Sequence, residues 1–203
     1  MRTDVENWSP LSVLDVAHLF SPLPIRWGIA GGWALDLHYG KQTREHSDTD
    51  VILSRADQEM VYHYLKPDWI LYRAEKGKLT LWEGEYLHDT NDIWVSRDEA
   101  SPFAFQMMII NIENDKWLYK RNNAIQRPAS ELFLTTPEGI PYLRPEIQLL
   151  HKGGSSQVRE KDFKDLMTHL PLLEPAEKEW LKSSLRVQFP AGHDWINYMD
   201  AGE

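Results

Sequence analysis

The chain has 203 residues, 42% of them hydrophobic and 26% charged, which is the composition of a folded globular protein rather than a disordered or fibrous one. Its 22 basic and 31 acidic side chains give a net charge of −9, which disfavours nucleic acid and anionic membranes as partners and favours cationic small molecules. The absence of cysteine excludes disulfides, thiolate catalysis and Cys-ligated zinc. With no signal-peptide core and no apolar run of membrane length, we expect a cytoplasmic protein without membrane contact.

The first part of the chain alternates between predicted helices and short strands. We expect a helix beginning at Ser9-Pro10, a buried strand over residues 25–30, a helix over residues 33–39 that stops at Gly40, and a strand over residues 48–53. A further helix follows Ser54, and strands follow at residues 69–72, 79–82, 93–95 and 103–112, the last returning as a hairpin. This order predicts a mixed α/β unit over residues 1–127.

From Pro128 onward the pattern changes to a proline-marked connection followed by helices. Apolar residues at positions i, i+3, i+4 and i+7 from Phe163 predict one helix, and Pro175 begins a final helix. We therefore divide the chain into a core at residues 1–127 and a helical C-terminal part at residues 128–203. Whether the two pack as one body is left open by the sequence.

The first candidate for chemistry is the Gly31-Gly32 turn between a strand and a helix. Glycine lets the backbone approach a ligand closely, and the free N–H groups at the start of a helix favour an anion such as a phosphate. Glycine pairs are common in ordinary turns, so this feature alone is weak.

The second candidate is Asp48-Thr49-Asp50 at the entry to an apolar strand. Side chains at i and i+2 of a strand point to the same face, so both carboxylates converge on one spot. Their repulsion needs a cation, and Mg²⁺ is commonly held by one or two carboxylates together with substrate phosphates. A solvated strand end is the alternative for a lone pair of this kind. Here a glycine turn, Arg44 and His46 precede it within 20 residues, as nucleotidyl transfer requires.

The spacing of these residues resembles the signature of the small antibiotic nucleotidyltransferases, the lincosamide and aminoglycoside 2''-nucleotidyltransferases of the polymerase-β-like superfamily. The matching positions are Gly31, Gly32, Trp33, Asp36, Gly40, Thr43, Arg44, His46, Asp48 and Asp50, and residues 145–165 resemble the family's C-terminal part. The resemblance implies a polymerase-β-like nucleotidyltransferase fold, with a mixed sheet flanked by helices and a helical C-terminal part.

The resemblance also implies a role for each matching residue. It implies a two-metal Mg²⁺ site at Asp48 and Asp50, and a nucleoside triphosphate contacted by Gly31, Gly32, Asp36, Arg44, His46 and Lys152. An acceptor hydroxyl then attacks the α-phosphorus and pyrophosphate leaves. For Asp36 we favour a supporting role over an ordinary helix-surface or cap position, and for Lys152 a solvated surface position is preferred to a nucleotide contact.

One position departs from the family pattern. The family carries a third carboxylate on a later strand, and the corresponding position here is Gln106, whose amide is a poor Mg²⁺ ligand and no base. We expect Glu113 or Asp92 to replace it, with Glu113 preferred as the third catalytic carboxylate. Because Gln106 and Glu113 differ by seven positions, a bulge must bring Glu113 to the right face.

The sequence therefore favours an Mg²⁺-dependent enzyme that transfers a nucleoside monophosphate, AMP from ATP, to a hydroxyl of a small molecule such as an aminoglycoside or lincosamide antibiotic. A tRNA-modifying nucleotidyltransferase toxin is a second hypothesis, disfavoured by the lack of a basic patch. A catalytically weak nucleotide-binding protein is the third, supported by Gln106. The acceptor, the preferred nucleotide and the oligomeric state are not encoded in a readable way.

Overall fold

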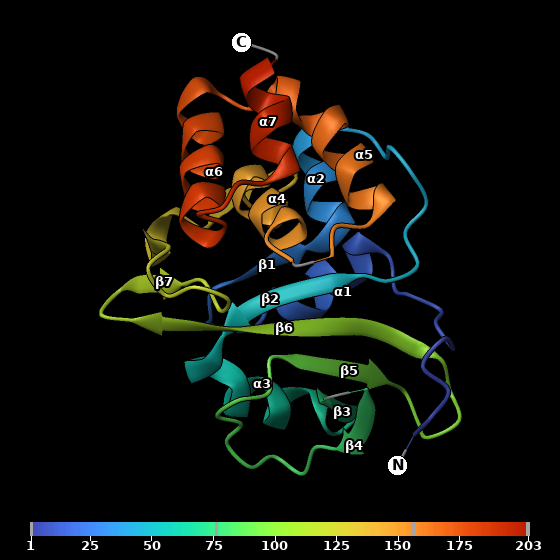
Figure 1. Cartoon of the computed structure of the whole chain (residues 1–203). Helices are drawn as coiled ribbons and strands as arrows, with labels where there is room; N and C mark the ends of the chain where they lie inside the picture. The colour runs from blue at the N-terminus through green and yellow to red at the C-terminus, as the bar shows by residue number, and fades with distance from the viewer. Residues whose placement is uncertain (1, 76, 156, 202–203) are drawn as a thin grey trace.

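A mixed β-sheet runs through the middle of the molecule and carries helices on both sides (Figure 1). The computed structural model describes residues 2–75, 77–155 and 157–201. Its helices are α1 (Val13–Phe20), α2 (Gly31–Tyr39), α3 (Gln58–Leu65), α4 (Pro145–Gly153), α5 (Glu160–His169), α6 (Pro175–Gln188) and α7 (Asp194–Ala201). Its strands are β1 (Trp27–Ala30), β2 (Asp50–Ser54), β3 (Ile70–Glu75), β4 (Lys78–Leu81), β5 (Asp92–Ser96), β6 (Phe103–Glu113), β7 (Lys116–Leu118), β8 (Gln126–Pro128), β9 (Phe133–Thr135) and β10 (Pro141–Leu143).

The strand order in the sheet is β4-β3-β5-β6-β2-β1-β10-β9, with β7 and β8 extending from the end of β6. Strand β2 pairs antiparallel with β1 and parallel with β6, which makes the sheet mixed. Strand β10, from the later part of the chain, lies parallel to β1. The predicted mixed α/β fold is thereby confirmed.

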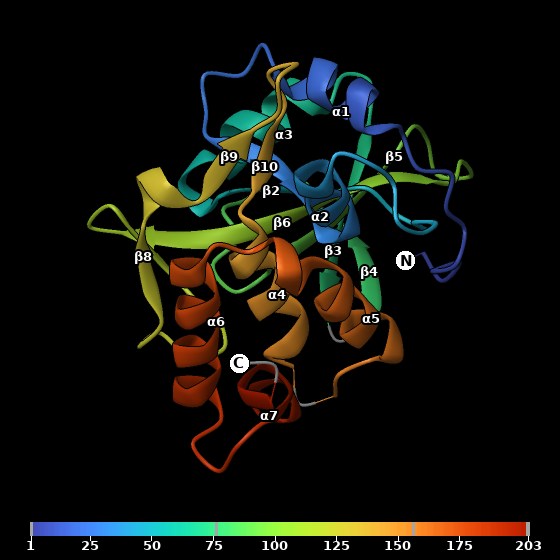
Figure 2. The same cartoon turned by 90° about the horizontal axis from the view of Figure 1, so that it is seen from above.

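The helices fall into two groups. Figure 2 shows α4, α5, α6 and α7 gathered on one side of β6, with α1 and α3 on the other. Helix α2 packs against α4 and α5, so the segment that follows Gly31-Gly32 is in contact with the C-terminal helices. The two predicted parts of the chain therefore meet along α2.

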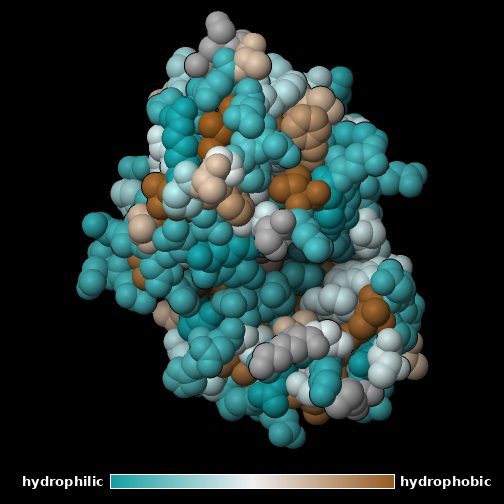
Figure 3. All heavy atoms as spheres, in the orientation of Figure 1, coloured by the Kyte–Doolittle hydropathy of each residue, from teal (hydrophilic) through white to brown (hydrophobic). Residues whose placement is uncertain are grey.

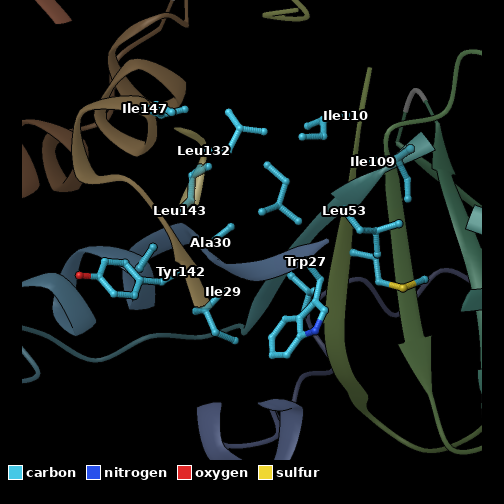
Figure 4. Close-up of a cluster of buried hydrophobic side chains, with 14 of the residues drawn as sticks. Trp27, Ile29, Ala30, Leu53, Ile109, Ile110, Leu132, Tyr142, Leu143 and Ile147 are labelled. Atoms are coloured by element: carbon cyan, nitrogen blue, oxygen red, sulfur yellow. The ribbon is translucent and has the colours of Figure 1, made fainter. Parts of the chain in front are cut away.

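One hydrophobic core joins the sheet to both groups of helices. Figure 4 shows Trp27, Ile29 and Ala30 of β1 beside Leu53 of β2, Ile109 and Ile110 of β6, Tyr142 and Leu143 of β10, and Ile147 of α4. All of these side chains are buried. Burial of apolar surface contributes about 25 cal/mol per Å². The core therefore fixes the strand ends on which the polar residues lie.

Local sequence explains where several elements begin and end. Helix α2 ends at Gly40, whose φ of +80° is the left-handed conformation that glycine adopts without strain. Helix α6 begins with a capping box in which Glu174 and Glu177 bond each other's backbone N–H groups. The β6–β7 hairpin turns through Asn114 and Asp115, which both have positive φ.

The structure corrects the sequence-based elements in three places. Helix α1 begins at Val13 rather than at Ser9-Pro10, because the Ser12 side chain accepts the N–H of Asp15 and caps the helix there. The proline-marked connection contains the short strands β9 and β10. Helix α7 is an additional element. Within the described ranges, no helix has the length and apolar character needed to cross a bilayer.

Candidate active site

The Asp48-Thr49-Asp50 segment lies at the start of β2, in the centre of the sheet. Asp50 is in register with Ala30 of β1 on one side and with Gln106 of β6 on the other. The Thr49 hydroxyl donates to the Leu11 carbonyl at 2.8 Å, and its side chain is buried. Since side chains alternate along a strand, Asp48 and Asp50 share the opposite face.

These carboxylates lie in a cleft of about 510 Å³ between the strands and the α4–α5 segment. Figure 3 shows a largely hydrophilic face, hollowed between the helices and the strands. The lining holds six cationic side chains against three carboxylates: Arg44, Lys120, Arg121, Lys152, Arg159 and Lys161 against Asp48, Asp50 and Asp162. The cleft is thus locally positive in a chain with a net charge of −9. Such a cleft attracts an anionic ligand.

The Asp50 carboxyl holds its proton more strongly than an ordinary aspartate does. Burial, with the nearby Asp48 carboxylate second, raises the pKa of Asp50 to about 7. A cation bound between the two carboxylates would remove their repulsion. The described residues contain no group of three or more acidic or histidine side chains arranged around a metal position. Asp48 and Asp50 fit Mg²⁺ that completes its coordination with water and phosphate oxygens, the usual arrangement for this ion.

The Gly31-Gly32 turn packs directly against this site. Gly31 has a φ of +68°, and a Cβ there would collide with the Asp50 carboxylate, so only glycine fits. A Cβ on Gly32 would collide with the His46 ring and lie 2.7 Å from Nη2 of Arg44. The Gly31 N–H donates to Oε1 of Gln148 in α4 at 2.8 Å. Because its N–H is occupied by Gln148, Gly31 does not offer a backbone donor to an anion.

Asp36 and His46 lie behind the wall of the cleft and do not line it. Asp36 is buried, and it accepts bonds of 2.5 Å from the Thr43 hydroxyl and from Nε2 of His46. Arg44 only donates, so its 3.0 Å contact with Nδ1 of His46 requires that nitrogen to be unprotonated. Burial also lowers the pKa of His46, despite its bond to Asp36. A neutral His46 thus holds the loop in place. The nucleotide contacts of Asp36 and His46 stay predictions, and the observed bonds give both residues a supporting position.

Arg44 and Lys152 do line the cleft, and both are held by α5. Arg44 donates two bonds to Asp165, from Nε at 2.9 Å and from Nη2 at 3.0 Å. Lys152 lies 2.7 Å from Asp165 and 3.4 Å from Asp162. The resemblance singled out Arg44 and residues 145–165 separately, but it did not show that they meet, since they lie far apart in the chain.

The third carboxylate predicted at Glu113 is not at this site. Strand β6 stays regular along its pairing with β2, and Glu113 pairs with Lys116 in the hairpin, seven positions beyond Gln106. At about 3.3 Å per residue, seven positions are about 23 Å. No bulge brings Glu113 back, so its assignment as a catalytic residue is corrected.

Asp92 of β5 is the carboxylate that the sheet brings to Gln106. Nε2 of Gln106 donates to Oδ1 of Asp92 at 3.1 Å, and Nζ of Lys120 lies 3.8 Å from its other oxygen. The preceding loop is clamped by the buried Arg55, which donates to Asn91 at 2.5 Å and to the carbonyl oxygens of Leu87 and Thr90. Asp92 is thus held one strand away from Gln106, which itself pairs with Asp50.

A mixed sheet, a pair of strand-end carboxylates and a glycine turn are the features that the resemblance to the nucleotidyltransferases predicts, and the chain is similar to known proteins of that class. Residues 12–76 match the sequence model of the aminoglycoside-2''-adenylyltransferase family. A curated lincosamide resistance protein from Staphylococcus haemolyticus is 25% identical over 161 residues, covering 73% of this chain and 86% of that protein.

Solved structures show the same fold. The lincosamide antibiotic adenylyltransferase LnuA, bound to lincomycin, has a TM-score of 0.57 at 19% identity, covering 82% of this chain and 99% of that chain. The antibiotic-resistance factor ANT(2'')-Ia in solution has a TM-score of 0.55 at 13% identity, covering 88% and 92%. Together, the sequence and structure comparisons confirm the resemblance to the antibiotic nucleotidyltransferase family.

Proposed function

We propose that the chain is an Mg²⁺-dependent nucleotidyltransferase that moves AMP from ATP to a hydroxyl of a small antibiotic of the aminoglycoside or lincosamide class. The observation that carries the proposal is the pair Asp48 and Asp50 inside a cleft with an excess of cationic side chains. The paired carboxylates suit a divalent cation, and the cationic side chains suit a triphosphate. We expect this reaction to take place in the cytoplasm, where ATP is available.

Asp48 and Asp50 are the residues that would hold Mg²⁺. When bound, Mg²⁺ neutralises charge on the phosphates and polarises the reacting oxygens. Arg44, Lys152 and the exposed Lys161 line the same cleft and bind the triphosphate electrostatically. Gly31 and Gly32 leave room for its close approach.

Asp92 is the residue that we propose as acceptor of the hydroxyl proton. Gln106 has no basic group, whereas Asp92 lies within hydrogen-bond distance of it. The Gln106 amide donates to one Asp92 oxygen and fixes the orientation of the carboxylate. The other oxygen remains on the side of Lys120 for a proton from the acceptor.

A second cavity, of about 550 Å³, supports a cationic acceptor. It is lined by Asp92 together with Glu75, Glu85 and Asp89, and Arg73 and His88 are its basic members. Amine groups of an antibiotic bound there would meet carboxylates, and its hydroxyls would lie at the edge that carries Asp92. Aminoglycosides have this chemistry to a greater degree than lincosamides do.

The test is to incubate the protein with each labelled nucleoside triphosphate, Mg²⁺ and a panel of aminoglycosides and lincosamides, and to measure pyrophosphate release and labelled antibiotic. We expect turnover with ATP and at least one antibiotic, and none with the Asp48→Asn variant. Antibiotic-independent labelling of tRNA would contradict the acceptor class.

Gln106 favours one second candidate, a nucleotide-binding protein with little catalysis. In that case ATP binds with Mg²⁺ but no panel member releases pyrophosphate. The Gln106→Asp variant then separates the two functions. A gain of turnover shows that the site lacked only a carboxylate beside Asp50, and no gain supports a binding function.

A further inference from the structure

Helix α5 carries two buried carboxylates that the catalytic assignment does not use. Asp162 is 2% exposed and Asp165 is 4% exposed. Buried carboxylates are costly unless they are paired and hydrogen-bonded. Both are paired here: Arg159 donates two bonds to Asp162, Arg44 donates two bonds to Asp165, and Lys152 lies between the two carboxylates.

Asp165 differs from Asp162 because it joins three separate segments. It belongs to α5, its partner Arg44 belongs to the loop before β2, and its partner Lys152 belongs to α4. Arg44 and Lys152 both line the cleft, whereas Asp165 does not. Asp165 therefore cannot touch a ligand in the cleft, but it sets the distance between two cations that can.

The hydrogen-bond donors of both cations are divided between the protein and the cleft. Arg44 has five N–H groups, of which two donate to Asp165, one to the Glu45 carbonyl and one to His46. Among the described residues, one N–H on Nη2 has no such partner, and this nitrogen lies against Gly32. Lys152 likewise directs two of its three N–H groups toward Asp165 and Asp162.

We propose that Asp165 is a positioning residue that fixes Arg44 and Lys152 together, so that the remaining donor of each points to the triphosphate of the nucleotide. This inference rests on the proposed nucleotidyltransferase function. It assigns a role in nucleotide affinity to a side chain outside the cleft. The role is to hold geometry, since the negative charge of Asp165 by itself opposes the binding of a triphosphate.

An electrostatic role and a positioning role of Asp165 therefore predict opposite changes in ligand affinity. The Asp165→Asn variant removes one negative charge close to the cleft, so a purely electrostatic role predicts tighter binding of inorganic tripolyphosphate and ATP. Positioning predicts weaker binding, by about tenfold or more, the effect of losing one well-aligned charge-assisted hydrogen bond. Calorimetry without Mg²⁺ measures the dissociation constant, and the binding stoichiometry reports the folded fraction.

The matched control is Glu160→Gln, which removes the same charge from the same helix. Glu160 is highly exposed, pairs with Lys164 and does not line the cleft. We expect its tripolyphosphate affinity to stay within about twofold of wild type, as for an exposed ion pair. In turnover, Asp165→Asn should raise KM for ATP by a larger factor than it lowers kcat.

A double-mutant cycle with Arg44→Gln shows whether Asp165 acts through Arg44. If it does, Asp165→Asn should weaken binding much less in the Arg44→Gln background than in wild type. Should Asp165→Asn not fold, Asp165→Glu keeps the charge and displaces it by one methylene, and it should also weaken tripolyphosphate binding.

The outcomes separate this inference from the proposed function. Wild-type protein that binds neither ATP nor tripolyphosphate overturns both. Wild-type binding together with equal or tighter binding by the Asp165 variants, or additive effects in the cycle, overturns the positioning role alone.

Discussion

The two walls of the cleft differ in charge, in chain origin and in what they do. The strand wall holds Asp48 and Asp50, which follow the Gly31-Gly32 turn within 20 residues. The helical wall holds Lys152, Arg159 and Lys161, from α4, α5 and the segment between them. In the proposed function the strand wall binds the metal, and the helical wall supplies most of the cations for the triphosphate, with Arg44 as the exception. The net charge of −9 for the whole chain describes neither wall.

The largest effect is expected from substitutions of the two carboxylates in the strand wall. Asp48→Asn or Asp50→Asn should lower turnover by about a thousandfold or more, because the metal's contribution to the transition state is several kcal/mol. The fold should persist, since removing one of two repelling carboxylates relieves strain between them. Pyrophosphate release and Mg²⁺-ATP calorimetry measure both effects. Unchanged affinity and turnover in both variants would remove the metal site from this wall.

The next prediction tests whether Asp92 of β5 takes part in catalysis together with the strand wall. Asp92→Asn should lower turnover by about a hundredfold, the usual contribution of a general base, while ATP affinity changes little because Asp92 does not line the nucleotide cleft. Glu113→Gln is the control, and it should behave as wild type. The reverse result, with Glu113→Gln inactive, would restore the carboxylate preferred from the sequence.

A smaller effect is expected where the two walls meet the glycine turn. Gly32→Val places a branched side chain against His46 and Arg44, so ATP affinity should fall by about tenfold. Melting temperature measured in parallel separates affinity from stability. Normal affinity per folded molecule with a collapsed melting temperature would mean that Gly32 serves packing only.

The last effect concerns stability rather than activity, and it is a difference in how acid affects the two walls. Burial, followed by the charges of Arg121 and Lys120, lowers the pKa of His151 in α4 to about 3. His151 thus favours folding above its unfolded pKa of about 6.5, and this stability is lost as pH falls from there toward 3. Below pH 6.5 the free energy of unfolding of wild type should fall with pH more steeply than that of His151→Gln. The difference should be about 1.4 kcal/mol per pH unit, measured by urea unfolding.

Asp50 should show the opposite sign in the metal-free protein. Its folded pKa of about 7 lies above the usual value of 3.8, so its contribution to stability grows as pH falls from 7 toward 4. Asp50→Asn should remove this gain. If the unfolding free energies of His151→Gln and Asp50→Asn depended on pH in the same way, the opposite roles assigned to the two walls would be wrong.

Most of the strand wall could be predicted because its signals are local. The Gly31-Gly32 turn, the stop at Gly40 and the Asp48–Asp50 pair each depend on residues a few positions apart. Asp92 was one of the two carboxylates expected beside Gln106, but the choice between it and Glu113 could not be made from the sequence, because it depends on the register between β5 and β6. Glu113 failed as a catalytic residue for a related reason: the expected bulge is absent, and β6 runs straight past the site.

The helical wall and the short strands were harder to predict. Strands β9 and β10 have three residues each, too few to be predicted from periodicity, and they exist because the edge of β1 offers hydrogen bonds. Helix α7 had a readable signal in Trp195, Ile196 and Met199, all buried on one face. The Asp165 cluster draws its members from three segments, so no spacing within one motif reveals it.

The pairing of β1 with β10 has a consequence for how the protein is made. Ile29 pairs with Tyr142, 113 residues later in the chain. At a synthesis rate of about 5–20 residues per second, the ribosome needs about 6 to 23 s to reach the neighbour of β1. During that interval the edge of β1 is exposed, and an open strand edge is a site for aggregation. The long separation between β1 and β10 thus makes the time of synthesis an interval of aggregation risk.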